Sequence, residues 1–197
     1  MVEKSVQSDK NHIVAIAWEM FWEKGYDNVE LNEIMEQSGL IKEEFEKYFT
    51  NKEDILYSLS NLFDERYAEL MVEMNPKLSS YEKLVLLNKE LFDMIENKIP
   101  MKLLGNLYSS QMIDNGDKHL LDKERLYYKL VNQIMEEGKL SGEFKTNSST
   151  DELVEAYAML ERGLLCDWCI GQNQKNLTKN SNKLMPNFLA GLLYIQK

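Results

Sequence analysis

The chain has 197 residues, of which 44% are hydrophobic and 28% charged, a composition that excludes collagen-like, repetitive and disordered proteins. Nine glycines and three prolines are too few for the frequent turns of an all-β protein, so long helices are expected. Lys and Arg number 23 and Asp and Glu 33, and the formal net charge of -10 argues against unassisted binding to nucleic acid or an anionic membrane. No stretch approaches the roughly 20 apolar residues of a membrane span, and we expect a cytoplasmic protein.

The first predicted helix covers about residues 9–24. Its apolar residues recur three and four positions apart and therefore share one face; they are Ile13, Ile16, Ala17 and Phe21. Gly25 follows where a left-handed C-cap would end the helix.

Two short amphipathic segments come next and are separated by Gly39. The first contains Leu31 and Ile34, and the second contains Phe45 and the pair Tyr48-Phe49. Two short helices around a glycine turn predict a helix-turn-helix.

The remaining segments are delimited by capping boxes, in which Ser or Thr stands three residues before Glu, and by proline or glycine breaks. Boxes are expected at Thr50–Glu53, Ser79–Glu82 and Ser149–Glu152; breaks are expected at Asn75-Pro76, Pro100, Asn115-Gly116, Gly138 and Gly142. Between them lie helical stripes, and the last helix carries Leu184, Phe188, Leu192 and Ile195. The sequence therefore predicts an all-α protein of about nine helices.

The N-terminal residues resemble the DNA-reading head of one known family. The matching residues are Ile13, Ala15, Ala17, Phe21, Gly25-Tyr26, Ile34, Ser38-Gly39, Tyr48-Phe49 and Lys52-Glu53. The most specific part is Tyr48-Phe49 followed by residues 51–56. In this order and spacing the first 56 residues resemble the TetR-type transcriptional regulators. More weakly, residues 138–140 and the helix with Arg162-Gly163-Leu164 resemble the segments that precede and form that family's dimer interface.

The resemblance implies an all-helical homodimer with a three-helix helix-turn-helix DNA-binding domain, residues 1–52, and a helical ligand-binding and dimerisation domain, residues 53–197. The expected partners are double-stranded DNA with an inverted-repeat operator and a small-molecule effector. Two recognition helices reach successive major grooves when they lie about 34–36 Å apart, so a ligand that changes this spacing weakens binding. Repression is the implied mode of regulation.

The head departs from the family pattern at several DNA-facing positions. Val29 and Ile41 stand where Thr or Ser usually caps a helix, and glutamates stand where Gly-Thr and an aromatic residue are usual; these are Glu43, Glu44 and Glu46. Residues 1–52 contain six lysines, no arginine and eleven acidic residues, which gives a formal charge of -5. The residues that keep a chemistry suited to DNA are Lys10, Lys42, Lys47, Tyr48 and Lys52. The alternative is a TetR-like dimer that has lost DNA binding and acts through a protein partner or as a ligand-binding protein.

The body is rich in aromatic residues and methionines, which suit an adaptable pocket for apolar ligands and equally suit an ordinary helical core. The candidate ligand-binding residues are Tyr67, Met71, Met94, Tyr108, Gln111, Met112, Tyr127, Tyr128, Tyr157 and Trp168. The resemblance favours a pocket for a small apolar or amphipathic molecule.

Small residues interrupt the last two long helices and permit a close approach of helices. The expected dimer interface consists of Ala156, Leu160, Gly163, Leu164, Phe188, Gly191 and Leu192, unless the same residues pack within one chain. Cys166 and Cys169 form a C-x-x-C without a second cysteine pair or a βαβ pattern around it, so we interpret them as packing residues. Catalytic motifs are missing from the sequence, and neither an enzyme, a cofactor nor a metal site is expected.

Overall fold

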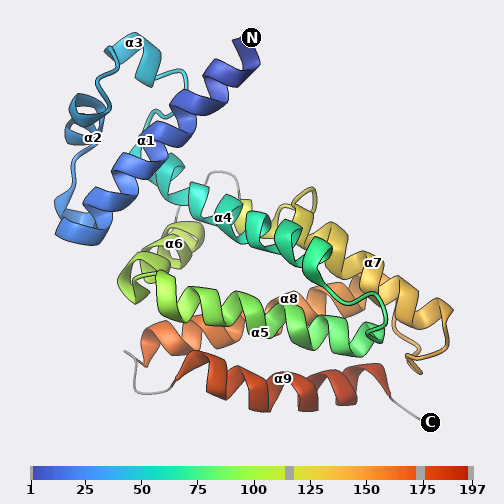
Figure 1. Ribbon diagram of the computed structural model, residues 1–197. Helices are drawn as coiled ribbons and strands as arrows, with labels where there is room; N and C mark the ends of the chain where they lie inside the picture. Colours follow the sequence, from blue (N-terminus) through green and yellow to red (C-terminus); the bar gives the residue numbers. More distant parts are fainter. Residues whose placement is uncertain (1, 114–117, 172–175, 195–197) are drawn as a thin grey trace. The chain divides into compact units, whose positions relative to one another are not determined.

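A computed structural model describes residues 2–113, 118–171 and 176–194, with no account of the side chains of residues 2–8. Over these residues the backbone forms nine α-helices and no strand, which confirms the all-α prediction. The helices are α1 (Val2–Lys24), α2 (Leu31–Ser38), α3 (Lys42–Phe45), α4 (Lys52–Glu73), α5 (Ser80–Lys98), α6 (Met101–Ile113), α7 (Leu126–Leu140), α8 (Thr150–Ile170) and α9 (Leu177–Leu193) (Figure 1). Two 3-10 helices, Tyr26–Asn28 and His119–Leu121, lie between them. The turn predicted at Asn115-Gly116 and the position of Ile195 lie outside the described residues.

The chain divides into two compact units. Unit 1 comprises Met1–Asn61 and Lys102–His119, and unit 2 comprises Leu62–Met101 and Leu120–Lys197. The helix α4 begins in unit 1 and ends in unit 2, whereas α6 belongs almost entirely to unit 1. These units are defined by packing, and the predicted functional division at residue 52 remains a prediction.

Unit 1 is organised around α1, against which α2 packs (Figure 1). The predicted apolar face is buried at Ile13, Ala17 and Phe21, and the indole N–H of Trp18 donates to the hydroxyl of Ser58 on α4 at 3.2 Å. The helix starts near residue 2 rather than 9, because neither glycine nor proline precedes Lys24 and extending a formed helix costs little. Gly25 ends it with a positive φ of 81°, but its ψ of 144° lies outside the predicted left-handed helical region.

The helix-turn-helix consists of α2, a turn and α3. Gly39 adopts the left-handed conformation, φ 69° and ψ 6°, which ends α2 at little steric cost. The residue that caps α2 is Glu30, whose backbone N–H donates to Glu33, so the cap expected at Val29 lies one residue later. Val29 is instead fully buried, which explains its apolar side chain. Ile41 does occupy the N-cap of α3 and makes no side-chain cap.

The capping box predicted at Thr50–Glu53 is displaced by one residue. The side chain of Asn51 accepts from the backbone N–H of Asp54 at 2.7 Å, and the carboxylate of Asp54 accepts from the backbone N–H and hydroxyl of Thr50. The reason is that α4 begins at Lys52, which places Asn51 rather than Thr50 before its first residue.

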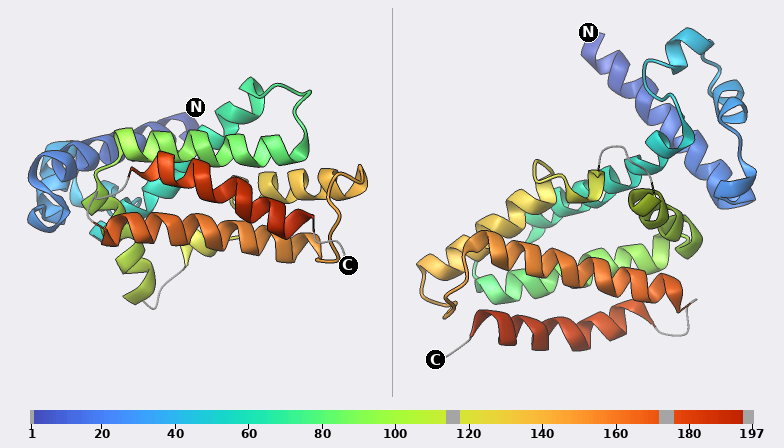
Figure 2. Two further views of the ribbon diagram at one scale, coloured as in Figure 1. Left: turned by 90° about the horizontal axis from the view of Figure 1, so that it is seen from below. Right: turned by 180° about the vertical axis from the view of Figure 1, so that it is seen from behind.

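Unit 2 is a helical bundle in which α7 and α9 each lie alongside both α5 and α8 (Figures 1 and 2). The two boxes predicted for it are confirmed. Ser79 and Glu82 exchange side-chain and backbone hydrogen bonds at the start of α5, and Ser149 and Glu152 do so at the start of α8. Such caps satisfy N–H groups that the first helical turn leaves unpaired, so they fix where each helix begins.

The buried face of α9 is not the predicted stripe. Within the chain α9 buries Leu177, Ser181, Met185, Leu189 and Leu193, while Leu184 is exposed. The residues at 188 and 192 are half-buried. The predicted stripe therefore lies on the side of α9 that the described chain leaves largely uncovered.

Candidate functional site

The first candidate site is the exposed side of α3 with the residues around it. Phe45 anchors α3 in the core of unit 1, and its other three residues, Lys42, Glu43 and Glu44, are exposed. Lys42 forms an ion pair with Glu46 at 3.5 Å, and Lys47 is exposed. The exposed surface that would face DNA thus contains carboxylates and ammonium groups in close alternation.

Two more of the predicted DNA-binding residues are engaged with neighbours in unit 1. The hydroxyl of Tyr48 donates to the carboxylate of Asp9 on α1 at 3.3 Å, and the pKa of Tyr48 is raised by burial and by that carboxylate. Lys10 lies over the ring of Phe49, with its ammonium 5.8 Å from the ring centroid. These contacts tie α1 to the end of the helix-turn-helix.

Lys52 is held inside the head. Its ammonium donates to the backbone carbonyl oxygens of Tyr26 and Val29, at 2.8 and 2.9 Å, and lies 4.2 Å from the ring centroid of Tyr26. The hydroxyl of Tyr26 in turn donates to Glu53 at 3.2 Å. Burial, followed by the charge of Glu53, raises the pKa of Tyr26. Lys52 therefore binds the 3-10 turn between α1 and α2 in addition to any role at DNA.

The second candidate site lies within unit 2. Seven of the ten predicted ligand-binding residues are buried, namely Tyr67, Met94, Tyr108, Tyr127, Tyr128, Tyr157 and Trp168. Met71 and Met112 are exposed, and Gln111 is half-buried. Tyr108, Gln111 and Met112 belong to unit 1 and the other seven to unit 2. The structure brings together Tyr67 on α4 and Tyr127 on α7, whose ring centroids are 5.3 Å apart.

The tyrosines surround a buried carboxylate that the sequence analysis did not single out. Glu161 on α8 accepts from the side-chain amide of Asn88 on α5 at 2.8 Å and from the hydroxyl of Tyr127 at 2.7 Å. The side-chain oxygen of Asn88 accepts from the hydroxyl of Ser181 on α9. Burial raises the pKa of Glu161, although these hydrogen bonds lower it. The hydroxyl of Tyr157 is a third neighbour of this carboxylate, and we refer to Asn88, Tyr127, Tyr157 and Glu161 as the carboxylate cluster.

A sequence signal for Glu161 existed. It stands four residues after Tyr157 and seven before Trp168, so it falls on the same face of α8 as these apolar residues. A charged residue on such a face is either paired in the core or functional. Asn88 and Ser181 gave no comparable signal, because their partners lie 73 and 93 residues away.

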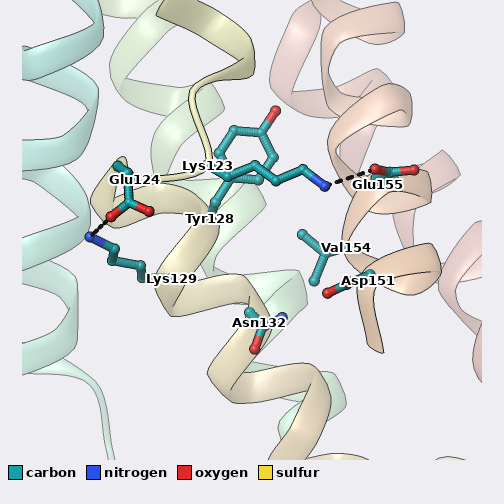
Figure 3. A pocket seen from close by; sticks show the side chains of 8 residues that line it. All are labelled: Lys123, Glu124, Tyr128, Lys129, Asn132, Asp151, Val154 and Glu155. Carbon is teal, nitrogen blue, oxygen red and sulfur yellow. Dashed lines mark hydrogen bonds and ion pairs between the residues drawn. The ribbon is translucent and has the colours of Figure 1, made fainter. Parts of the chain in front are cut away.

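A surface cleft of about 380 Å³ opens between α7 and α8 (Figure 3). It is lined by Lys123, Glu124, Tyr128, Lys129, Asn132, Asp151, Val154 and Glu155. Lys123 reaches Glu155 at 3.1 Å and Lys129 reaches Glu124 at 2.8 Å, so both ammonium groups are paired. The hydroxyl of Tyr128 donates to the carbonyl of Leu120 and accepts from the guanidinium of Arg162 at 2.9 Å.

The predicted dimer interface lies on neighbouring faces of α8 and α9. Gly163 and Gly191 are exposed, Ala156, Leu160, Phe188 and Leu192 are half-buried, and Leu164 is buried within the chain. Large apolar side chains beside them are also exposed, notably Met159, Ile170 and Leu184. We call the exposed and half-buried residues of the predicted interface, together with Met159, Ile170 and Leu184, the α8–α9 strip.

The two cysteines are half-buried on α8. The thiol of Cys169 donates to the carbonyl of Met101 at 3.8 Å. Burial, with a smaller contribution from Cys166, raises the pKa of Cys169 to about 11, and burial also raises the pKa of Cys166. Thiols with raised pKa values are poor nucleophiles, in keeping with packing residues. In the described parts of the chain no helix has the length and apolar character needed to cross a membrane.

The chain is similar to known proteins over most of its length. Residues 13–59 match the family described as bacterial regulatory proteins of the tetR family, and residues 73–193 match the C-terminal region of QacR-like proteins. The fatty acid metabolism regulator protein of Bacillus subtilis strain 168 is 24% identical over 181 residues, which cover 91% of this chain and 93% of that protein.

Two solved structures share the fold. One is the transcriptional regulator FadR from Bacillus subtilis in complex with stearoyl-CoA, 21% identical with a TM-score of 0.70, covering 92% of this chain and 98% of that one. The other is Thermus thermophilus FadR in complex with lauroyl-CoA, 19% identical with a TM-score of 0.75, covering 95% and 97%. At these identities the likeness is one of fold.

Proposed function

The chain belongs to the TetR family of bacterial regulatory proteins, and on that premise we propose that it represses transcription until an acyl compound releases it from its operator. As a member of this family it is a transcriptional regulator that binds operator DNA as a homodimer and responds to a small molecule. The proposal adds the sign of regulation, the chemical class of the effector and the residues that carry each role.

The observation that carries the effector proposal is the group of buried aromatic residues around the carboxylate cluster in unit 2. Ligand pockets are mostly apolar, with a few converging polar groups that fix the ligand's orientation. Tyr67 and Tyr127 supply apolar area, and Glu161 with Asn88 supplies polar atoms. The relatives whose structures contain stearoyl-CoA and lauroyl-CoA support an acyl thioester as the compound bound here.

For the head we propose residues 1–52 as the DNA-binding domain and residues 53–197 as the ligand-binding and dimerisation domain. Recognition helices place their N-terminal residues at the bases, and Lys42 is the first residue of α3. Lys42, Lys47, Tyr48 and Lys10 are the proposed DNA contacts, with Lys52 as a further contact through the part of its ammonium not bound within the head.

The α8–α9 strip is the proposed dimer interface. Exposed apolar residues and two exposed glycines on adjacent helices allow a second copy to approach closely and to bury Met159, Ile170 and Leu184. We further propose a cytoplasmic protein without enzymatic activity.

The test of the head is the selection of genomic fragments by the purified dimer at low and moderate salt, followed by a search for an enriched inverted repeat. We expect a palindrome, weakened by Lys42→Ala and unchanged by Lys145→Ala, which removes an exposed lysine from unit 2. A folded dimer that enriches no repeat at either salt would contradict DNA binding. Exposed Glu43 and Glu44 favour that alternative, a TetR-like dimer that acts through a protein partner or as a ligand-binding protein.

The test of the effector uses the operator complex so obtained. Lauroyl-CoA and stearoyl-CoA are added separately, with coenzyme A alone as the control, and the fraction of bound DNA is measured by fluorescence anisotropy. We expect micromolar thioester to release the DNA and coenzyme A to have no effect. A complex that survives both thioesters refutes the acyl effector and leaves the DNA-binding proposal intact.

A further inference from the structure

Glu161 stands apart from the other charged residues in its burial. Among the buried side chains of the described ranges it is the one Asp, Glu, Lys, Arg or His, and only 4% of its surface is exposed. A buried carboxylate is costly to desolvate and persists where hydrogen bonds or function hold it. The number of hydrogen-bond donors that reach it therefore matters.

The described residues satisfy this carboxylate only in part. An ionised carboxylate offers about four acceptor positions. The amide of Asn88 and the hydroxyl of Tyr127 take one each. The third neighbour, Tyr157, has one hydroxyl proton, and a good hydrogen bond directs it to the carbonyl oxygen of Leu84 at 2.9 Å. Acceptor capacity therefore remains on Glu161 for a further donor.

The charge near Glu161 limits which kind of hydrogen-bond donor a ligand can place there. Arg162 follows Glu161 on α8, and its guanidinium donates to the hydroxyl of Tyr128, whose ring packs on that of Tyr127, so positive charge is already present near the cluster. A donor from the ligand then needs no charge of its own. A neutral O–H group fits this environment, because an ammonium would place a second cation near Arg162.

The carboxylate cluster is linked to the cleft of Figure 3 by a contact between two tyrosine rings. Tyr128 lines that cleft, and its ring meets the ring of Tyr127 edge to face with centroids 4.9 Å apart. Tyr127 in turn donates to Glu161. Tyr127 therefore contacts both the cleft-lining Tyr128 and the carboxylate of Glu161.

We propose that the effector is a hydroxylated acyl chain whose hydroxyl donates to Glu161 after entering through the cleft between α7 and α8. The inference rests on the acyl effector proposed above and specifies it. A saturated chain at the same place would leave hydrocarbon against the carboxylate. Sites built to hydrogen-bond a ligand hydroxyl discriminate strongly against the analogue that lacks it, because their own polar groups are then left unpaired.

The test compares four probes on the wild-type dimer by isothermal titration calorimetry. They are lauroyl-CoA, 3-hydroxylauroyl-CoA, 12-hydroxylauroyl-CoA and coenzyme A. We expect at least one hydroxylated thioester to bind 10-fold or more tightly than lauroyl-CoA. The variant Glu161→Gln is expected to reduce that preference at least fivefold while lauroyl-CoA affinity changes less than threefold. Glu136→Gln replaces an exposed carboxylate of α7 that does not line the cleft, and it is expected to leave the preference unchanged.

The outcomes separate the two proposals. If lauroyl-CoA binds as well as both hydroxylated thioesters, the role of Glu161 is refuted and the acyl effector stands. If no thioester binds to the folded dimer, both are refuted. The comparison on the wild-type protein needs no variant, so it can refute the role of Glu161 even if Glu161→Gln folds poorly.

Discussion

Lys47 and Lys52 lie five residues apart and carry the same charge, yet the structure predicts different consequences when each is replaced by Met. Lys52 donates two charged hydrogen bonds, at 2.8 and 2.9 Å, to carbonyl oxygens of the 3-10 turn and packs on Tyr26. Charged hydrogen bonds contribute about 1.5–3 kcal/mol each, but these carbonyls can rehydrate, so we expect a total loss of about 2 kcal/mol. For a chain of this size the melting temperature falls by roughly 4–8 °C.

Lys47→Met is expected to act on DNA binding alone. Lys47 is exposed, so the melting temperature should stay within about 1 °C. Each phosphate contact contributes about -0.9 to the slope of log affinity against log salt, and a dimer has two heads. Removing Lys47 should therefore make the slope shallower by about 2. Differential scanning fluorimetry and a salt titration of operator binding measure the two quantities. A Lys52→Met protein with unchanged melting temperature but a shallower slope would refute our assignment of the two lysines.

Three further outcomes are expected. Gly138→Ala should lower the free energy of unfolding by about 1–2 kcal/mol in urea titrations. The added Cβ would lie 2.2 Å from the buried ring of Phe144, and the cost of this overpacking exceeds the gain in helix propensity. An unchanged or raised urea midpoint would contradict this contact. With a pKa of about 11, Cys169 is thiolate in about one molecule in a thousand at pH 8, so native protein should react with a thiol reagent far more slowly than protein in urea, and equal rates would disprove it. Burial raises the pKa of Glu161 above its ordinary 4.5, so the folded chain holds that proton more tightly than the unfolded chain. The stabilisation that this proton contributes is complete at low pH and is lost as pH rises through the folded-state pKa. Glu161→Gln should remove this decline in the free energy of unfolding, which urea titrations from pH 4 to 8 measure. An equal decline in the variant would refute the role of Glu161.

The sequence by itself determined the features whose cause is local. The boxes at Ser79–Glu82 and Ser149–Glu152 were predictable because a side chain and a backbone N–H three residues apart meet whenever a helix begins between them. The turn at Gly39 was predictable because few other residues adopt its positive φ. The displaced cap at Asn51 shows the limit of such patterns, since two adjacent polar residues competed for one position.

The tertiary structure alone decided which polar groups meet. Lys52 is bound by carbonyl groups 23 and 26 residues before it, and Glu161 is bound by side chains from α5 and α7. The sequence placed Tyr127 and Tyr157 among the candidate ligand-binding residues, but it could not show that Asn88 lies beside them. The role of these residues in ligand binding remains a prediction. The physical reason is the distance along the chain over which each interaction acts. Helix propensity and capping act over a few residues and can be recognised from the spacing of residue types in the sequence, whereas a buried hydrogen bond depends on how separate helices pack.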